Sequence, residues 1–249
     1  MPQKIALLSD LHANREALES VLEHTRAQGA TEYVLLGDFV GYGADPGWVL
    51  DKVREMVSEG AIVVRGNHDE AVVRGASPTM RPEPRFVIEW TRSQLDERQI
   101  DFLATLPFSV EREDRLYVHA NAFAPEGWEY IQGRMEAVRS LHATSCHYTF
   151  CGHMHEPRLY HLAMTGKAGD FIPTAGVPIP LPAHRQWLVI PGSVGQPRDG
   201  NPAACYAMFE PGLQQLTYHR VPYDHETAGA KIQAAGLPQR LATRLGDGH

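Results

Sequence analysis

Residues of the types that bind transition-metal ions occur in five short blocks of this sequence. Carboxylate, imidazole and amide side chains are ligands for Mn²⁺, Fe²⁺, Ni²⁺ and Zn²⁺. Each block alone has an ordinary explanation, such as an aspartate that caps a helix, a turn, or a histidine that is satisfied in the core. The blocks are Asp10-Leu11-His12, Gly37-Asp38, Gly66-Asn67-His68-Asp69, His119 and Gly152-His153-Met154-His155.

Each block ends or directly follows a segment that is predicted to be a β-strand. Short apolar runs predict strands over 5–8, 33–36, 61–64, 115–119 and 148–151. Helical spacing of apolar residues predicts a helix over 14–27, with Asn14 as its N-cap, and another that starts at Asp45-Pro46. This alternation indicates parallel βαβ units. Because sites form at the carboxyl ends of strands in such sheets, we expect all five blocks to meet at one edge of one sheet.

The rest of the chain is predicted to be helical in the middle and richer in strands afterwards. Helices are expected over roughly 83–106, with Phe86, Trp90, Leu95 and Leu103 in the core, and over 133–142. Strands are expected over 159–162, 187–190, 203–209 and 214–220, and short helices over 226–235 and 238–245. The proline-rich segment 166–182 is predicted to be a loop or flap. Residues 1–249 are therefore expected to form a single domain, a sandwich of two sheets with flanking helices.

Composition narrows the classes of protein. The 249 residues are 43% hydrophobic and 21% charged, which can build a sizeable core and excludes a disordered chain. A formal net charge of −7 without a Lys/Arg run argues against nucleic acid as a partner. No apolar run approaches the ~20 residues that cross a membrane, and residues 4–8 are too short for the apolar part of a signal peptide.

The three cysteines are Cys146, Cys151 and Cys205, and no two of them are spaced as Cys-x-x-Cys. Buried small side chains in a reducing compartment explain them most simply, so a cytoplasmic location is expected.

The five blocks together resemble the calcineurin-like metallophosphoesterase superfamily. The resemblance runs from about residue 4 to 155 and extends to Pro191-Gly192-Ser193-Val194-Gly195. It is strongest to the small bacterial and archaeal phosphodiesterase branch, which begins with Ser-Asp-x-His and carries a late Pro-Gly-Ser segment. This family implies a four-layer α/β/β/α sandwich of two mixed sheets, which belongs to the α/β class.

The resemblance also implies a set of ligands for two divalent metal ions, with Mn²⁺ expected first and Fe²⁺, Ni²⁺ or Zn²⁺ as alternatives. Asp38 bridges the two ions. Such a pair, about 3.5–4 Å apart, can hold both the attacking and the leaving oxygen during displacement at phosphorus. One ion takes Asp10, His12, Asp38 and His155, and the second takes Asp38, Asn67, His119 and His153.

Catalysis is expected to proceed by direct attack of the hydroxide that bridges the two metals. His68 resembles the family's histidine that stabilises the developing charge and protonates the leaving oxygen. Asp69 either orients His68 or caps the following helix, and the two readings are equally supported. Arg198, in a glycine-rich loop after a predicted strand, is a candidate for binding the substrate phosphate.

Two blocks depart from the pattern of this branch. Met154 stands where relatives carry threonine; because side chains alternate in extended backbone, Met154 is expected to point away from the metals. His119-Ala120-Asn121-Ala122 replaces the more usual His-Gly-Ser or His-Ala-Ser, so the substrate contact expected at Asn121 is less certain than the ligand role of His119.

The leading hypothesis is a phosphodiesterase or phosphatase that acts on a small phosphate ester. A protein Ser/Thr phosphatase or dinucleoside tetraphosphatase is the first alternative, although residues 37–43, Gly-Asp-Phe-Val-Gly-Tyr-Gly, lack the phosphate-binding arginine of those relatives. A nuclease is disfavoured by the acidic charge. The other alternative is a non-catalytic, metal-binding regulatory module, which would be expected to have lost ligands. The sequence predicts neither the oligomeric state nor the physiological substrate.

Overall fold

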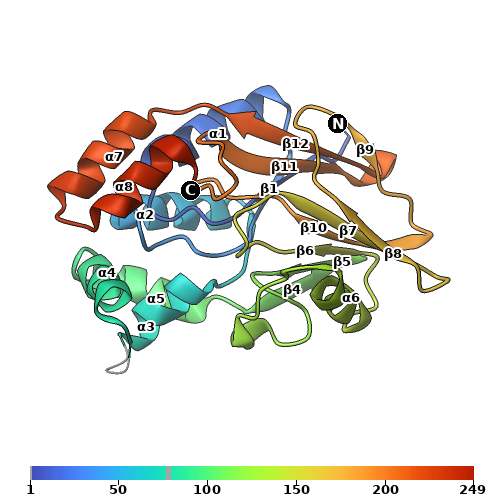
Figure 1. Cartoon of the computed structure of the whole chain (residues 1–249), viewed down its shortest axis with the longest axis horizontal. Coiled ribbons are helices and arrows are strands. Elements are labelled where there is room, and N and C mark those ends of the chain that lie inside the picture. The colour runs from blue at the N-terminus through green and yellow to red at the C-terminus, as the bar shows by residue number, and fades with distance from the viewer. Residues whose placement is uncertain (1, 77–79) are drawn as a thin grey trace.

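The computed structural model describes residues 2–76 and 80–249, and in this part of the chain the strands form two facing six-stranded sheets (Figure 1). The first sheet has the strand order β3 (Ile62–Val63), β2 (Glu32–Leu35), β1 (Ile5–Leu8), β11 (Ala204–Glu210), β12 (Gln215–Val221) and β9 (Ile179–Pro180). The second has the order β4 (Ser109–Arg112), β5 (Arg115–Val118), β6 (Tyr148–Phe150), β10 (Arg185–Ile190), β7 (Arg158–Ala163) and β8 (Ala168–Phe171). Both sheets are mixed, because β1, β2 and β3 are parallel, as are β5, β6 and β10.

The surroundings of the central strand β1 explain why its sequence is apolar without interruption. Successive side chains of a strand point to opposite faces of the sheet. Ile5 and Leu7 pack between the two sheets, against residues such as Phe150, while Ala6 and Leu8 pack in the core beneath the first outer helices. Both faces of the strand are therefore buried, and a fully apolar run results.

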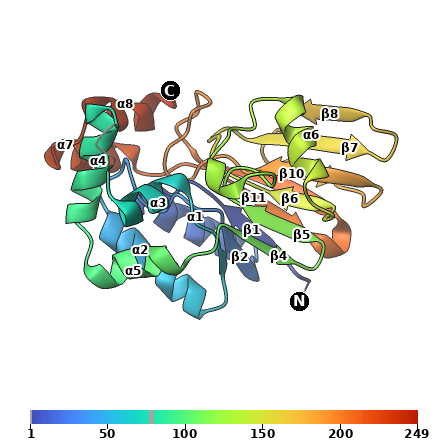
Figure 2. The same ribbon diagram turned by 90° about the horizontal axis from the view of Figure 1, so that it is seen from below.

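Helices cover the outer face of each sheet, so the molecule has four layers (Figure 2). Helices α1 (Arg15–Ala27) and α2 (Pro46–Ser58) bury Val21 and Val53 against the first sheet. Helix α6 (Arg134–His142) buries Leu141 against the second. The α/β/β/α arrangement expected from the family resemblance is confirmed.

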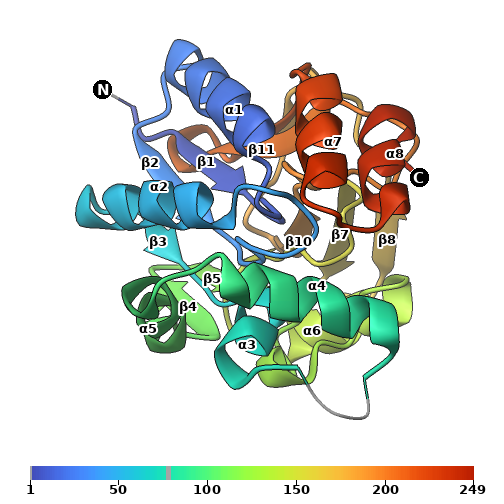
Figure 3. The same ribbon diagram turned by 90° about the vertical axis from the view of Figure 1, so that its left-hand side faces the viewer.

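Two further groups of helices lie at one end of the sandwich (Figure 3). The first contains α3 (Asn67–Arg74), α4 (Pro82–Ser93) and α5 (Glu97–Thr105), and the second is the C-terminal pair α7 (His225–Ala234) and α8 (Gln239–Asp247). Val87 of α4 packs with Leu241 and Leu245 of α8. The two groups therefore meet above the carboxyl ends of the parallel strands.

The region over 83–106, expected to be helical, contains the two helices α4 and α5. Asp96 accepts a hydrogen bond from the Gln99 backbone N–H (2.8 Å), and Gln99 Oε1 accepts one from the Asp96 N–H (3.1 Å), a capping box that starts α5. Periodicity alone missed this start because apolar residues continue on both sides. Phe86, which was expected in the core, is 45% exposed.

The segment 166–182, expected to be a loop, contains two strands. β8 pairs with β7, and β9 pairs with β12, each at the edge of its sheet. Edge strands need little apolar sequence, and a proline such as Pro180 is tolerated there because one side of the strand makes no ladder bonds. The hairpin strand β4, another edge strand, was missed for the same reason.

No helix in residues 2–76 or 80–249 has the length and apolar character to span a bilayer.

Asn14 starts α1 as the sequence predicted, and it also ties that helix to two distant segments. Its Oδ1 accepts from the Ala17 backbone N–H (3.1 Å), while Nδ2 donates to the Gly195 carbonyl (2.9 Å) and to the Tyr223 hydroxyl (3.2 Å). Asp45 occupies the corresponding position before α2, but its side chain makes no capping bond; instead it pairs with Lys231 of α7 (2.8 Å).

Replacement of Asn14 tests this double role. Asn14→Ala should lower the free energy of unfolding by about 2 kcal/mol, roughly half from the lost cap and half from the Gly195 carbonyl left without its donor. Asn14→Ser keeps a capping oxygen and should recover about half of the loss. Urea denaturation measures both values. Equal stabilities for the alanine and serine variants would contradict the cap.

Candidate metal centre

The predicted ligand blocks meet between the two sheets, at one end of the sandwich. β1, β2 and β3 of the first sheet lead to Asp10, Asp38 and Asn67. β5 and β6 of the second sheet lead to His119 and His153. The prediction of convergence is right, but the prediction of a single sheet is wrong. An apolar run identifies a buried strand without identifying the sheet that it joins.

The structure brings the predicted Asp and His ligands into two groups that share Asp38. In each group the ligand atoms lie within 4.8 Å of one another, and every member is buried. Asn67, the one predicted ligand with a side-chain amide, places its Oδ1 3.1 Å from Nε2 of His119, beside the second group. The first group is Asp10, His12, Asp38 and His155, and the second is Asp38, His119 and His153.

The Asp38 carboxylate is oriented so that one oxygen faces both groups. Its Oδ1 accepts a hydrogen bond from the His68 backbone N–H (2.8 Å). Its Oδ2 lies 3.6 Å from Nε2 of His12 and 3.4 Å from Nε2 of His119. A single oxygen thus has access to both groups, as a bridging ligand requires.

Within each group, two histidine rings direct nitrogen atoms at each other. Nε2 of His12 lies 3.1 Å from Nε2 of His155, and Nε2 of His119 lies 3.2 Å from Nδ1 of His153. The remaining nitrogen of each ring faces a backbone carbonyl oxygen, which only accepts, so a neutral ring carries its N–H on that side. The facing nitrogens are then two acceptors with opposed lone pairs. A cation between them removes the repulsion, so this donor set fits a transition-metal ion.

The carbonyls that orient the rings come from loops of the same centre. A second partner of this kind fixes the tautomer and direction of a ligating histidine. The carbonyl partners are Val40 for His12 (3.1 Å), Gln196 for His155 (2.6 Å), Leu36 for His119 (2.6 Å) and Trp128 for His153 (3.0 Å).

Charge in the second group depends on Asp38. Burial opposes a charged imidazole at His119, but the Asp38 carboxylate outweighs burial and raises the pKa of His119 to about 9. Burial, together with the charge on His119, lowers the pKa of His153 to about 3. Without a metal, the second group therefore favours one added proton, on His119 beside Asp38. A metal ion would take the place of that proton, because a ligating histidine must be neutral.

The backbone at most of these residues is in the left-handed region, which side chains other than glycine rarely occupy. Each such residue costs on the order of 1–3 kcal/mol and persists only where surrounding structure holds it. Strain of this kind concentrates at functional sites. The residues are Asp10 (φ 55°), His12 (φ 46°), Asp38 (φ 54°), His153 (φ 67°) and His155 (φ 60°).

This conformation changes the explanation for Met154. The residues beside it are left-handed and not extended, so simple alternation of side chains does not apply. Met154 nevertheless packs against the core between the second sheet and α6, away from the two ligand groups. The expected direction is right and the expected reason is wrong.

Asp69 braces the loop that carries Asp38. Its two oxygens accept from the backbone N–H groups of Asp38 (2.9 Å), Phe39 (2.9 Å) and Gly66 (2.9 Å). A Cβ at Gly66 would lie 2.2 Å from the Asp38 backbone nitrogen, so only glycine allows this close approach. Burial and the neighbouring Asp38 carboxylate raise the pKa of Asp69 to about 7, although the amide donors favour its charged form.

The catalytic role expected for Asp69 is therefore not supported. No hydrogen bond joins Asp69 to the His68 ring among the described residues, and the carboxylate is fully buried. Of the two readings left open by the sequence, helix capping is right, and the same carboxylate also holds the Asp38 loop.

His68 lies at the side of the first group with its ring partly exposed. Its ring centroid is 4.9 Å from that of His12 and 4.3 Å from that of Tyr42. No hydrogen bond to its ring nitrogens is found in the described part of the chain. Burial lowers the pKa of His68. A side chain that contacts a ligand group without belonging to it matches the separate position predicted for His68.

Asn121 does not have the position expected of a substrate ligand. Its side chain is fully buried; Nδ2 donates to the Glu129 carbonyl (2.9 Å), and Oδ1 accepts from the Ala124 N–H (2.8 Å). Both polar groups are used within the loop that presents the Trp128 carbonyl to His153. Asn121 thus holds a loop in place, which the pattern around His119 could not reveal.

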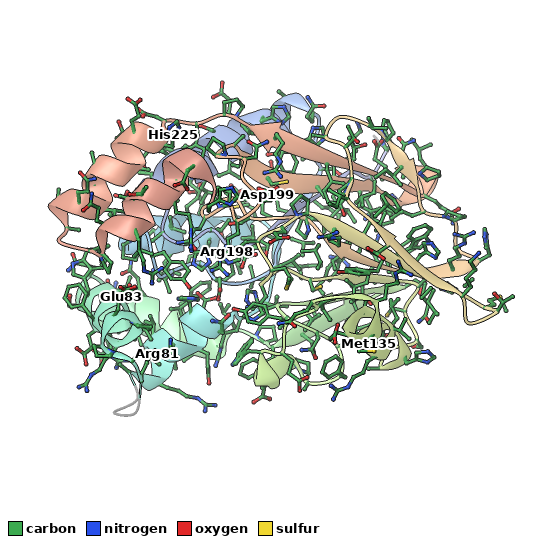
Figure 4. All side chains as sticks on the ribbon, in the orientation of Figure 1. Arg81, Glu83, Met135, Arg198, Asp199 and His225 are labelled. Carbon is green, nitrogen blue, oxygen red and sulfur yellow. The ribbon has the colours of Figure 1, made fainter. Side chains whose placement is uncertain are left out.

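Arg198 is half-buried and lies beside Tyr42, whose ring contacts His12 of the first group. Figure 4 shows it below the α7–α8 pair, away from peripheral residues such as Arg81 and Met135. Its Nη2 donates long hydrogen bonds to the Tyr42 hydroxyl (3.5 Å) and to Gln196 Oε1 (3.3 Å). The predicted approach of Arg198 to the site agrees with this position. Contact with a phosphate remains a prediction.

Tyr42 is the residue of the site that the sequence analysis missed. Its ring centroid lies 4.5 Å from that of His12, in addition to its contact with His68. The signal was an aromatic residue between Gly41 and Gly43, directly after the Asp38 block.

Comparison with known proteins gives a consistent result. Residues 3–212 match the calcineurin-like phosphoesterase superfamily domain. An uncharacterised protein of Methanocaldococcus jannaschii is 33% identical over 247 residues, which cover 97% of this chain and 96% of that protein. Phosphodiesterase YfcE of Escherichia coli K12 is 26% identical over 217 residues, covering 83% of this chain and 87% of that enzyme.

Among solved structures, a metallophosphoesterase from Sphaerobacter thermophilus superposes with a TM-score of 0.88. It is 35% identical in sequence, and the match covers 100% of both chains. The four-layer fold and the arrangement of its strands are therefore shared along the whole length of the two proteins.

Replacement of the shared aspartate tests the bridging geometry. Asp38→Asn should weaken metal binding at both positions by more than about tenfold, at least the cost of losing an orienting partner, because an amide nitrogen would replace Oδ2, the oxygen that faces both groups. Metal content after dialysis measures the effect. Asp101→Asn, at an exposed position of α5, is the matched control. Loss at only one position would contradict bridging.

Replacement of Asp69 tests the bracing role. Asp69→Ala leaves several buried N–H groups without an acceptor, so the free energy of unfolding should fall by about 3 kcal/mol and metal content should fall with it. Asp69→Asn keeps one acceptor oxygen and should be intermediate. If Asp69→Asn instead kept full stability and metal content but lost activity, a direct catalytic role would be restored.

Proposed function

Since this chain belongs to the calcineurin-like phosphoesterase superfamily, we propose that it is a hydrolase of phosphate esters that works with two divalent cations. The observation that carries the proposal is the pair of close contacts between histidine ring nitrogens, 3.1 and 3.2 Å apart, on either side of Asp38. In a network of amide and carboxylate groups, amide N–H donors would pair with oxygen acceptors. Without a metal, this network leaves two acceptors facing each other in the first group and needs a proton on His119 in the second, so a cation is favoured in each group.

Each predicted ligand keeps its role in this proposal. The first cation takes Asp10, His12, Asp38 and His155, and the second takes Asp38, Asn67, His119 and His153. When bound, two such ions generate a nucleophile from water near neutral pH and offset the charge of a phosphate. The mixture of imidazole and carboxylate ligands favours Mn²⁺, with Fe²⁺, Ni²⁺ or Zn²⁺ as alternatives.

The chain's own residues supply the other requirements of the reaction. His68 lies beside the first group with its ring nitrogens available, so it can donate an N–H to the leaving oxygen. Arg198 lies on the same side as His68, next to Tyr42, and a guanidinium binds phosphate oxygens in pairs. We therefore propose that the phosphate sits between the cations and Arg198.

A small phosphodiester is the favoured substrate class, with phosphomonoesters second. The likeness to an enzyme named as a phosphodiesterase supports this order. A protein phosphatase or dinucleoside tetraphosphatase is less favoured, because Tyr42 stands in the loop where those relatives carry their phosphate-binding arginine. A non-catalytic regulatory module is disfavoured, since all predicted ligand positions are filled and brought together.

Turnover of p-nitrophenyl phosphate and bis-p-nitrophenyl phosphate tests the proposal, with metal content measured on the same samples. Mn²⁺ should restore activity after removal of metal by a chelator, and the diester should be the better substrate. A protein that holds two ions per chain yet turns over neither ester would support the regulatory module instead.

His68→Ala tests the separate role of this histidine. The turnover number should fall by roughly 10²–10⁴, the usual contribution of a general acid, while metal content stays unchanged because His68 is not a ligand. His142→Ala, at an exposed position of α6, serves as the control and should retain full activity. Unchanged activity of His68→Ala would exclude the catalytic role.

A further inference from the structure

Tyr42 contacts each class of residue that the proposed function requires. Its ring lies 4.5 Å from the ligand His12 and 4.3 Å from His68, measured between centroids, and its hydroxyl accepts from Arg198 Nη2 at 3.5 Å. One side chain thus connects the metal centre, the candidate acid and the candidate phosphate ligand.

The backbone is built to place this ring. Tyr42 has φ 67°, a left-handed conformation that is a genuine outlier for a bulky side chain. A Cβ at Gly41 would lie 2.5 Å from Nδ1 of His68, so the preceding glycine is needed for the ring of His68 to fit. Strain of about 1–3 kcal/mol at Tyr42 persists because the surrounding structure holds it.

The far side of Tyr42 is supported by the C-terminal helices. The ring packs against the cluster formed by Val87 of α4 and by Ile232, Leu241 and Leu245 of α7 and α8. It also lines a narrow cavity with Ile232 and Leu241. Tyr42 is therefore fixed between a hydrophobic wall and the metal centre.

The Arg198 guanidinium, in contrast, has a hydrogen-bond donor that the described residues leave unused. Its Nε is buried and has no hydrogen-bond partner in the structure, and no ion pair joins it to a carboxylate among the described residues. The adjacent Asp199 is paired with Arg220. A partly buried guanidinium without an acidic partner is available to bind an anion.

We propose that Tyr42 is a positioning residue that holds the Arg198 guanidinium, through its hydroxyl, and the His68 ring, through its face, in place for one phosphate group. The guanidinium that binds phosphate then comes from the loop after β10. The loop after Asp38 supplies the tyrosine that orients this guanidinium. This inference rests on the proposed phosphoesterase function and adds to it the residue that organises the phosphate-binding side of the site.

Tyr42→Phe keeps the ring and removes the hydroxyl, so it isolates the contact with Arg198. Affinity of the metal-loaded protein for inorganic phosphate, measured by calorimetry, should fall about threefold to tenfold, the range of one hydrogen bond. KM for bis-p-nitrophenyl phosphate should rise by a similar factor with little change in the turnover number. Metal content and melting temperature should stay at the wild-type values.

Coupling to Arg198 is measured with a double-mutant cycle. Arg198→Ala should weaken phosphate binding by more than about tenfold, because it removes charged donors. Adding Tyr42→Phe to Arg198→Ala should then cost less than about twofold, since the hydroxyl acts through the guanidinium. Arg240→Ala is the control for a general loss of positive charge, because Arg240 of α8 is paired with Glu83 on the surface; it should leave phosphate affinity unchanged.

Additive losses in the double variant, or unchanged phosphate affinity in Tyr42→Phe, would overturn the positioning role. A fall in metal content or melting temperature without a change in phosphate affinity would show a structural role only and would also overturn it. Absence of phosphate binding to the wild-type protein would do the same. If the wild-type protein binds phosphate but hydrolyses neither test ester, the proposed function fails, and the phosphate affinities of the variants still decide the role of Tyr42.

Discussion

Two pairs of histidine nitrogens, each about 3 Å apart with lone pairs opposed, are the constraint on which the rest of the site depends. Backbone carbonyls fix the N–H of each ring on its outer side, so the inner nitrogens have only acceptors to offer. The protein alone can relieve one such contact by protonating His119 next to Asp38. Cations relieve both, and because they bind the folded arrangement, they also stabilise it. Strained backbone at Asp38 and at the neighbouring candidate ligands is typical of a functional site.

The segment from Leu36 to Val40 contacts both ligand groups and connects them. Leu36 orients a histidine of the second group and Val40 orients one of the first, while Asp38 between them faces both. Asp69 then holds this segment by its backbone N–H groups. Five consecutive residues thus contact both groups. This is the physical basis for expecting the two metal positions to be coupled.

Sequence patterns predicted the parts of this site that depend on residue type and on the end of a strand. The blocks containing Asp10, Asp38 and His153 were recognised because carboxylate and imidazole side chains follow apolar runs. The choice between the two roles of Asp69, and the role of Asn121, could not be predicted, because a buried carboxylate or amide that bonds to backbone looks the same in sequence as one that meets a substrate. The choice of sheet for each strand, the break before α5 and the edge strands β8 and β9 depend on tertiary pairing, which local periodicity does not contain.

The segments that orient the ligating histidines also carry the side chains that border the site. The Gln196 carbonyl fixes His155, and Arg198 follows two residues later. The Trp128 carbonyl fixes His153, and Tyr130, two residues later, stacks on that histidine at 4.0 Å while remaining 42% exposed. Residues that would select a substrate are thus covalently close to the groups that set metal geometry. A substitution at Arg198 or Tyr130 changes a bordering side chain, whereas a change in the length of either loop also moves a carbonyl oxygen that orients a histidine.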